Sequence, residues 1–152
     1  MPGSLFDEIR RLQESAENLD LYLTEVAKVI NRFYPFYTWV GFYFLKEDGK
    51  LHVGPYIGKP TPHIIIDLNK GICGAAVSQE ETIVVDDVNA DPRYLACSLE
   101  TKSEIVIPLW VKGKIIGELD IDSNKKAAFS SEHKKELEEV ARLIERRLDK
   151  GL

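Results

Sequence analysis

The chain has 152 residues, the size of one ordinary domain, and its 44% hydrophobic and 30% charged residues are typical of a globular protein. Its net charge is −5, and its basic residues form no long run, which argues against nucleic-acid binding because phosphate contacts need a basic surface. No basic segment followed by an apolar stretch opens the chain, and no apolar run approaches the ~20 residues of a membrane span, so we expect a cytoplasmic protein that does not bind membranes.

Two amphipathic helices are expected at the start of the chain. Apolar residues recur at three- and four-residue spacing over Leu5–Asn18 and again over Asp20–Phe33. Pro35 then ends the second helix, because proline cannot continue it. Residues 1–34 are therefore assigned to N-terminal helices.

Residues 37–123 are expected to form a sheet and the loops of a pocket. The aromatic and β-branched run Thr38–Leu45 and the following Leu51–Tyr56 predict a hairpin around the Asp48-Gly49 turn. The other expected elements are a strand over His63–Leu68, a short helix over Gly71–Ser78, a strand over Thr82–Val85, an irregular segment over Asn89–Ser98, and a hairpin of Glu104–Val111 with Ile115–Ile121.

A closing helix is expected over residues 130–149, with Ser130 or Ser131 as its N-cap. Strands joined by tight turns pair antiparallel, so the element order indicates one α+β domain over residues 1–152 with an antiparallel or mixed central sheet. The N- and C-terminal helices would cover one face of this sheet. The other face would then be available for a ligand pocket.

Alternation along the strands separates aliphatic positions from aromatic and acidic ones. Trp39, Gly41 and Tyr43 share one face of the first strand, and Glu104 lies opposite the aliphatic face of its own strand. The last strand is expected to carry four side chains on one face, namely Ile116, Glu118, Asp120 and Asp122. An aromatic wall above an acidic floor would suit a small cationic or zwitterionic ligand. The alternative is a solvated sheet face with ordinary surface acids.

Both cysteines are candidates for chemistry. Cys73 lies at the start of the expected short helix, where the helix N-terminus would lower the pKa of its thiol. Cys97 lies in an expected loop, where a cysteine is less easily explained as core filler. The alternative is that both are small buried apolar residues. The cysteines and histidines show none of the short spacings of a zinc site, so no metal site is expected.

Seven segments between Trp39 and Phe129, taken together, resemble the GAF-domain family of free methionine-(R)-sulfoxide reductases. Their order matches the family, and so does the spacing of Cys73 and Cys97. The segments are Trp39–Tyr43, Gly54–Lys59, Lys70–Gly74, Val85–Val88, Ala96–Cys97, Ser103–Pro108 and Gly117–Ser123.

This resemblance implies a GAF fold, which has a central antiparallel sheet with helices on one side and a ligand pocket on the other. It also implies an enzyme that reduces the R-sulfoxide of free methionine. It implies Cys97 as the nucleophile, whose sulfur attacks the sulfoxide sulfur, releases methionine and is left as a sulfenic acid. A second cysteine then forms a disulfide with Cys97, and thioredoxin or another dithiol reduces it. The family binds no cofactor and uses this external reductant.

The resemblance also implies the substrate-binding residues. Trp39 and Tyr43 would surround the methyl sulfoxide end, and Glu104, Asp120 and Asp122 would be the acidic residues of the site. The chemistry agrees, because a sulfoxide oxygen must gain a proton before it can leave, and clustered carboxyl groups raise one another's pKa. Another carboxylate could hold the ammonium group of a free amino acid.

Some positions depart from the family pattern. His63 stands where the family often has a further cysteine, Ser98 replaces an aspartate that often follows the nucleophile, and Pro92–Leu95 replaces Pro-Gly-His-Ile. Cys73 is then the candidate within the chain to resolve oxidised Cys97, and an external thiol is the alternative. A non-catalytic GAF module that binds a small ligand or senses redox state is the alternative to the enzyme. A homodimer is left open as the oligomeric state.

Overall fold

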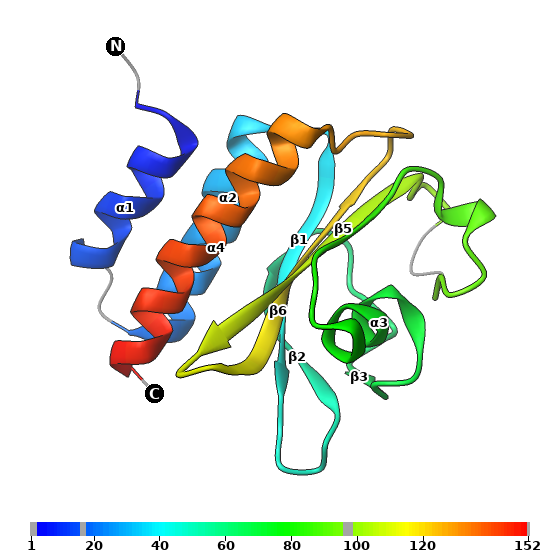
Figure 1. The fold of residues 1–152 in the computed structure, drawn as a ribbon. Coiled ribbons are helices and arrows are strands. Elements are labelled where there is room, and N and C mark those ends of the chain that lie inside the picture. The colour runs from blue at the N-terminus through cyan, green and yellow to red at the C-terminus, as the bar shows by residue number, and fades with distance from the viewer. Residues whose placement is uncertain (1–2, 16–17, 96–98, 152) are drawn as a thin grey trace.

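The computed structural model describes residues 3–15, 18–95 and 99–151, which form four α-helices and one six-stranded sheet (Figure 1). The helices are α1 Leu5–Ser15, α2 Leu19–Phe33, α3 Gly71–Gln79 and α4 Ser131–Gly151, with a 3₁₀ turn η1 at Val88–Ala90. The strands are β1 Tyr37–Leu45, β2 Leu51–Ile57, β3 Ile65–Ile66, β4 Ile83–Val85, β5 Ser103–Val111 and β6 Lys114–Ser123. None of the helices within these residues has the length and apolar character needed to cross a bilayer.

The strand order is β3-β2-β1-β6-β5-β4, and each neighbouring pair is antiparallel. The helices α1, α2 and α4 lie on one face of this sheet, and α3 lies on the other (Figure 1). The expected α+β architecture is therefore confirmed. The last strand in sequence, β6, lies between β1 and β5, so its side chains are neighbours of residues on both.

Local signals in the sequence explain where several elements begin. The Asn18 side chain accepts a hydrogen bond from the Leu21 amide at 2.8 Å and caps α2. Ser130 caps α4, because its hydroxyl accepts from the His133 amide at 3.2 Å. Lys112 and Gly113 join β5 to β6 with φ of +53° and +77°, the left-handed conformation that a tight two-residue hairpin requires.

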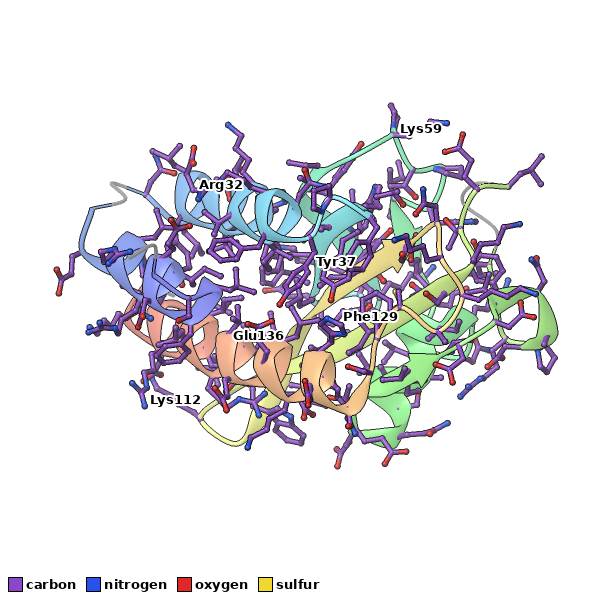
Figure 2. The ribbon with its side chains drawn as sticks, turned by 90° about the horizontal axis from the view of Figure 1, so that it is seen from above. Arg32, Tyr37, Lys59, Lys112, Phe129 and Glu136 are labelled. Atoms are coloured by element: carbon purple, nitrogen blue, oxygen red, sulfur yellow. The ribbon has the colours of Figure 1, made fainter. Side chains whose placement is uncertain are left out.

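The main hydrophobic core lies between the sheet and the three helices of the first face. Val40 and Phe42 of β1 are fully buried there, together with the expected aliphatic positions of β5 and β6. Tyr37 and Phe129 pack with ring centroids 5.0 Å apart where β1 meets the segment leading to α4 (Figure 2). This face positions the strands and leaves their other face for the site.

The expectation for Ile116 is wrong. Ile116 packs against the core on the helical face, and Ile115 packs against the cluster on the opposite face. The cause is a β-bulge: Leu109 pairs with Gly117 while Trp110 pairs with Ile115, so Ile116 is an extra residue that reverses the alternation. Beyond Gly117 the expected alternation holds.

The strand expected over His63–Leu68 is only two residues long. Ile65 and Ile66 pair with His52 and Leu51 at the edge of the sheet. Pro62 precedes the segment, and the amide of Lys70 donates to the Asp67 carbonyl at 3.1 Å to close a turn after it. An edge strand between a proline and a turn has few partners, which accounts for its short length.

Candidate active site

Four carboxyl groups meet on the sheet face opposite the three packed helices. Glu118, Asp120 and Asp122 alternate along β6, and Glu104 of β5 pairs directly with Asp122. All four side chains are buried, and Glu118 is 0% exposed. The solvated sheet face considered as an alternative is therefore wrong, because α3 packs over β5 and β6 and removes these acids from water.

Burial changes the proton affinity of this acid cluster, which consists of Glu104, Glu118, Asp120 and Asp122. Desolvation raises the pKa of each of the four carboxyl groups above its ordinary value. The charge of Asp120 raises the pKa of the other three further. Within the described part of the chain, no Lys, Arg or His forms an ion pair with any of them. The cluster therefore retains protons to higher pH than exposed acids do.

Cys73, the third residue of α3, points into this cluster and is 5% exposed. Its Sγ donates a hydrogen bond to Oδ2 of Asp120 at 3.4 Å. The expectation that the helix N-terminus lowers the pKa of this thiol is wrong. Burial, followed by the charges of Asp120 and Glu118, raises its pKa well above the ordinary value. Cys73 is therefore held as a neutral thiol beside a proton acceptor.

An aromatic wall stands beside the acids. Trp39 stacks on Tyr56 with centroids 5.0 Å apart and on Tyr43 at 6.1 Å. The Trp39 indole donates to the Lys59 carbonyl at 3.1 Å, and the Tyr43 hydroxyl donates to the His63 carbonyl at 2.8 Å. These bonds connect the wall to the loop after β2 and fix the orientation of both rings.

Two small cavities are bounded by the aromatic wall and the acid cluster. One, of about 70 Å³, has Trp39 and Asp122 in its lining. The other, of about 20 Å³, is bounded by Tyr43, Cys73, Glu104 and Asp120, among others. The structure thus brings six residues expected from the sequence to one site: Trp39, Tyr43, Cys73, Glu104, Asp120 and Asp122.

A surface ion pair lies at the rim of the larger cavity. Nζ of Lys59 contacts Oε1 of Glu100 at 3.0 Å, and both residues line this cavity. Lys59 is labelled in Figure 2 at the outer edge of the molecule. Exposed pairs of this kind contribute little stability, so the contact can open without a large energetic cost.

Cys97, the expected nucleophile, lies outside the described residues. The described residues nearest to it on the N-terminal side, Tyr94 and Leu95, pack against the hydrophobic cluster around Cys73. Leu95 also lines the smaller cavity, and so does His63, which occupies the position of the additional family cysteine. Leu95, two residues before Cys97 in the sequence, is therefore part of the site.

Two residues of the site, Glu118 and Tyr56, are not among the substrate-binding residues that the resemblance implied. Strand alternation placed Glu118 on the acidic face with Asp120, and the structure buries it there. Tyr56 stacks on Trp39, and only its place in the resembling segment Gly54–Lys59 pointed to it.

The fold also assembles potential metal ligands that the sequence keeps apart. Sγ of Cys73 and carboxylate oxygens of Glu104 and Asp120 all lie within 4.8 Å of one another. These residues come from α3, β5 and β6, so they are far apart in the sequence and no short spacing predicts the cluster. The expectation of no metal site rested only on such spacing.

The sequence and the fold of the chain were compared with those of known proteins. The GAF domain family model matches residues 18–148. Over 109 residues the chain is 43% identical to the free methionine-R-sulfoxide reductase of Saccharomyces cerevisiae, which covers 70% of this chain and 60% of that protein.

Solved structures show the same similarity over more of the chain. The type II free methionine-R-sulfoxide reductase from Thermoplasma acidophilum matches with a TM-score of 0.81 at 36% identity, covering 98% of both chains. The free methionine-R-sulfoxide reductase from Neisseria meningitidis, solved in complex with its substrate, matches with a TM-score of 0.90 at 32% identity. That match covers 95% of this chain and 86% of the other.

Proposed function

The chain belongs to the GAF domain family, among its free methionine-R-sulfoxide reductases, and we propose that it reduces its substrate through Cys97 at the acid cluster. It is an oxidoreductase that converts free methionine-R-sulfoxide to methionine. The observation that carries the assignment of the site is the set of buried acids beside Trp39 and Tyr43 on one face of the sheet. Acids with raised pKa values beside an aromatic wall suit a sulfoxide that must be protonated and held by its methyl group.

In the proposed first step the sulfur of Cys97 attacks the sulfoxide sulfur. The S–O bond of the sulfoxide breaks, the oxygen is transferred to Cys97, and the products are methionine and a cysteine sulfenic acid. The sulfoxide sulfur gains the two electrons that the cysteine sulfur loses. A protonated carboxyl of the cluster donates to the departing oxygen, and the thiol proton of Cys97 replenishes the cluster.

Substrate recognition is assigned to the two walls of the pocket. Trp39 and Tyr43 enclose the methyl sulfoxide end, where apolar and aromatic surface is available. A carboxylate of the cluster, from Glu104, Asp120 or Asp122, binds the ammonium group. A peptide-bound residue lacks that free ammonium and is bulkier, so the small cavities favour the free amino acid.

The second step removes the oxygen from Cys97. The sulfenic acid and the Cys73 thiol condense to a disulfide and water, and an external dithiol, such as a thioredoxin, reduces the disulfide. Asp120 is placed to accept the Cys73 proton, because the two side chains are hydrogen-bonded. No bound cofactor is needed in this scheme.

The central test of the function is substrate selectivity. Purified protein with a dithiol reductant is expected to convert free methionine-R-sulfoxide to methionine and to leave the S epimer and a peptide-bound sulfoxide unchanged. Chiral chromatography of the remaining sulfoxides measures both preferences in one reaction. Absence of turnover with every reductant would leave only a ligand-binding GAF module.

Resolution through Cys73 predicts a specific oxidation product. After one equivalent of sulfoxide without reductant, the wild type should lose two thiols and two hydrogens within one chain. Cys73→Ser should instead accumulate a sulfenic acid at Cys97 that dimedone traps. Thiol counting and intact mass distinguish the two products. A dimedone adduct on wild-type Cys97 with Cys73 still free would show that an external thiol performs this step.

Gly41 is expected to be necessary for the aromatic wall. A Cβ at this position would lie 2.6 Å from Cη2 of Trp39 and would also overlap the Tyr56 side chain. Gly41→Ala should therefore displace the stacked rings and raise KM by about tenfold or more, because small displacements in a binding site weaken positioning strongly. Steady-state kinetics would measure the change.

The matched control for Gly41→Ala is Val40→Ala, which alters the opposite face of the same strand. Val40 lies in the core on the helical face. This variant should lower the melting temperature without changing KM. Equal KM values for Gly41→Ala and the wild type would show that the ring stack does not position the substrate.

A further inference from the structure

At the base of the pocket, the thiol of Cys73 lies close enough to two carboxyl groups for all three to bind one metal ion. Sγ of Cys73 and carboxylate oxygens of Glu104 and Asp120 lie within 4.8 Å of one another, and the Cys73–Asp120 pair is separated by 3.4 Å. In a tetrahedral zinc site, a thiolate sulfur and a carboxylate oxygen lie about 3.6 Å apart. These three groups therefore need only small adjustments to share one ion.

Two further observations point to a ligand at this place. The adjoining cavity of about 20 Å³ is bounded by the same three residues and has the volume for one water-sized particle. Glu118 is fully buried and faces the Cys73 thiol, yet neither of its carboxylate oxygens accepts a hydrogen bond of ordinary geometry from the described residues. Oδ1 of Asp120 and Oδ1 of Asp122 are likewise buried without such a partner.

The charge balance favours a cation. Four buried carboxyl groups face one another, and none forms an ion pair with a basic side chain in the part of the chain that the structure describes. Buried charges are ordinarily paired or bound to metals. A divalent ion would displace the protons that these carboxyl groups retain and would compensate the negative charges left behind.

We propose that Cys73, Glu104 and Asp120 form a Zn²⁺ site, with Glu118 or Asp122 beside it, and that zinc bound there inhibits the enzyme. A thiolate ligand favours zinc over magnesium or calcium, which prefer oxygen ligands alone. Binding displaces the thiol proton of Cys73, together with any proton on the coordinating carboxyl groups, and releases these protons to water with no change of oxidation state.

Inhibition follows from shared residues, and this half of the proposal rests on the proposed function. Zinc would occupy the carboxylates that are assigned to the sulfoxide oxygen and the ammonium group. It would also hold Cys73 as a metal-bound thiolate, which cannot condense with a sulfenic acid while it is coordinated. Substrate and zinc should therefore exclude each other.

Cobalt(II) is the probe for the thiolate ligand. Reduced full-length protein, stripped of metal with EDTA and then freed of the chelator, is titrated with Co²⁺ in the absence of added thiols. One equivalent should produce the near-ultraviolet sulfur-to-cobalt charge-transfer band and tetrahedral visible bands, and Zn²⁺ should abolish both. Cys97→Ser should retain the bands, and Cys73→Ser should lose them.

A second measurement keeps the test independent of how well Cys73→Ser folds. Competition with a chromophoric chelator gives the Kd for Zn²⁺, which should rise at least about tenfold in Glu104→Gln and in Asp120→Asn. His52→Ala is the matched surface control, because His52 and Asp48 form an exposed pair at 2.8 Å that could bind metal adventitiously. Its affinity for zinc should equal that of the wild type.

Several outcomes would overturn the proposal. Among them are no charge-transfer band, a band that Cys97→Ser removes while Cys73→Ser retains it, and unchanged zinc affinity in both carboxyl variants. Zinc should lower wild-type turnover at least tenfold and EDTA should restore it, so full activity at saturating zinc would refute inhibition. A protein that binds cobalt through Cys73 but never reduces sulfoxide would instead refute the proposed function and retain the metal site.

Discussion

Cys97→Ser is expected to abolish turnover, lowering kcat/KM by about 10⁴-fold or more. The physical reason is nucleophilicity: a thiolate attacks sulfur readily, whereas a serine hydroxyl at neutral pH is a far weaker nucleophile and forms no sulfenic acid. The measurement is methionine formation under saturating dithiol reductant. Circular dichroism and the melting temperature should match those of the wild type, which separates lost chemistry from lost folding.

Cys73→Ser is the matched control for this experiment. It removes the other cysteine and should leave a full single turnover, because the first step requires only Cys97. Multiple turnover should slow unless an external thiol resolves the sulfenic acid. An active Cys97→Ser protein together with an inactive Cys73→Ser protein would reverse the assigned roles.

Neutralising the acid cluster is expected to have the second-largest effect. Asp120→Asn or Glu104→Gln should lower kcat/KM by about 10²-fold or more, the usual contribution of a positioned proton donor. Asp48→Asn is the control, because Asp48 is an exposed carboxylate on the β1–β2 turn and should not affect turnover. Wild-type kinetics in both cluster variants would mean that these acids do not take part in the reaction.

The same variants should alter the pH dependence of folding stability, measured in the presence of EDTA. A buried acid with a raised pKa keeps its proton in the folded chain at pH values where the unfolded chain has lost it. Its contribution is therefore most favourable at low pH and declines as the pH rises above the ordinary carboxyl pKa. Asp120→Asn should flatten this decline, and thermal unfolding between acid and mildly alkaline pH would measure it.

Much of this arrangement could be predicted from residue patterns. The alternation in β1, β5 and β6 correctly placed Trp39 and Tyr43 on the face that carries Glu104 and Asp120. It failed at Ile116, because a bulge depends on the register between two strands and leaves no mark in one strand's pattern. The function came from the resemblance of several segments taken together, since no composition or periodicity identifies a sulfoxide as substrate.

The properties of Cys73 show why the rest required a structure. Its position at a helix start favoured a low thiol pKa, but that local argument ignored what the fold packs against the sulfur. The carboxyl groups of Asp120 and Glu118 approach it from a strand far along the chain, and burial acts in the same direction. Packing against residues distant in the sequence thus raises the pKa of the Cys73 thiol, whereas its near neighbours alone predicted a lowered pKa.

Both ends of the described chain lie in the helical layer, with α1 packed on α4 (Figure 1). Trp39, Cys73 and the acid cluster lie on the other face of the sheet, where α3 packs. A fluorescent protein, an affinity matrix or an electrode attached through α1 or α4 would consequently lie on the side of the sheet away from the acid cluster. The helical layer is therefore the side of the molecule to which another group can be attached. It offers a natural scaffold for a biosensor of oxidised methionine, in which the transducer and the sensing surface occupy opposite sides of one sheet.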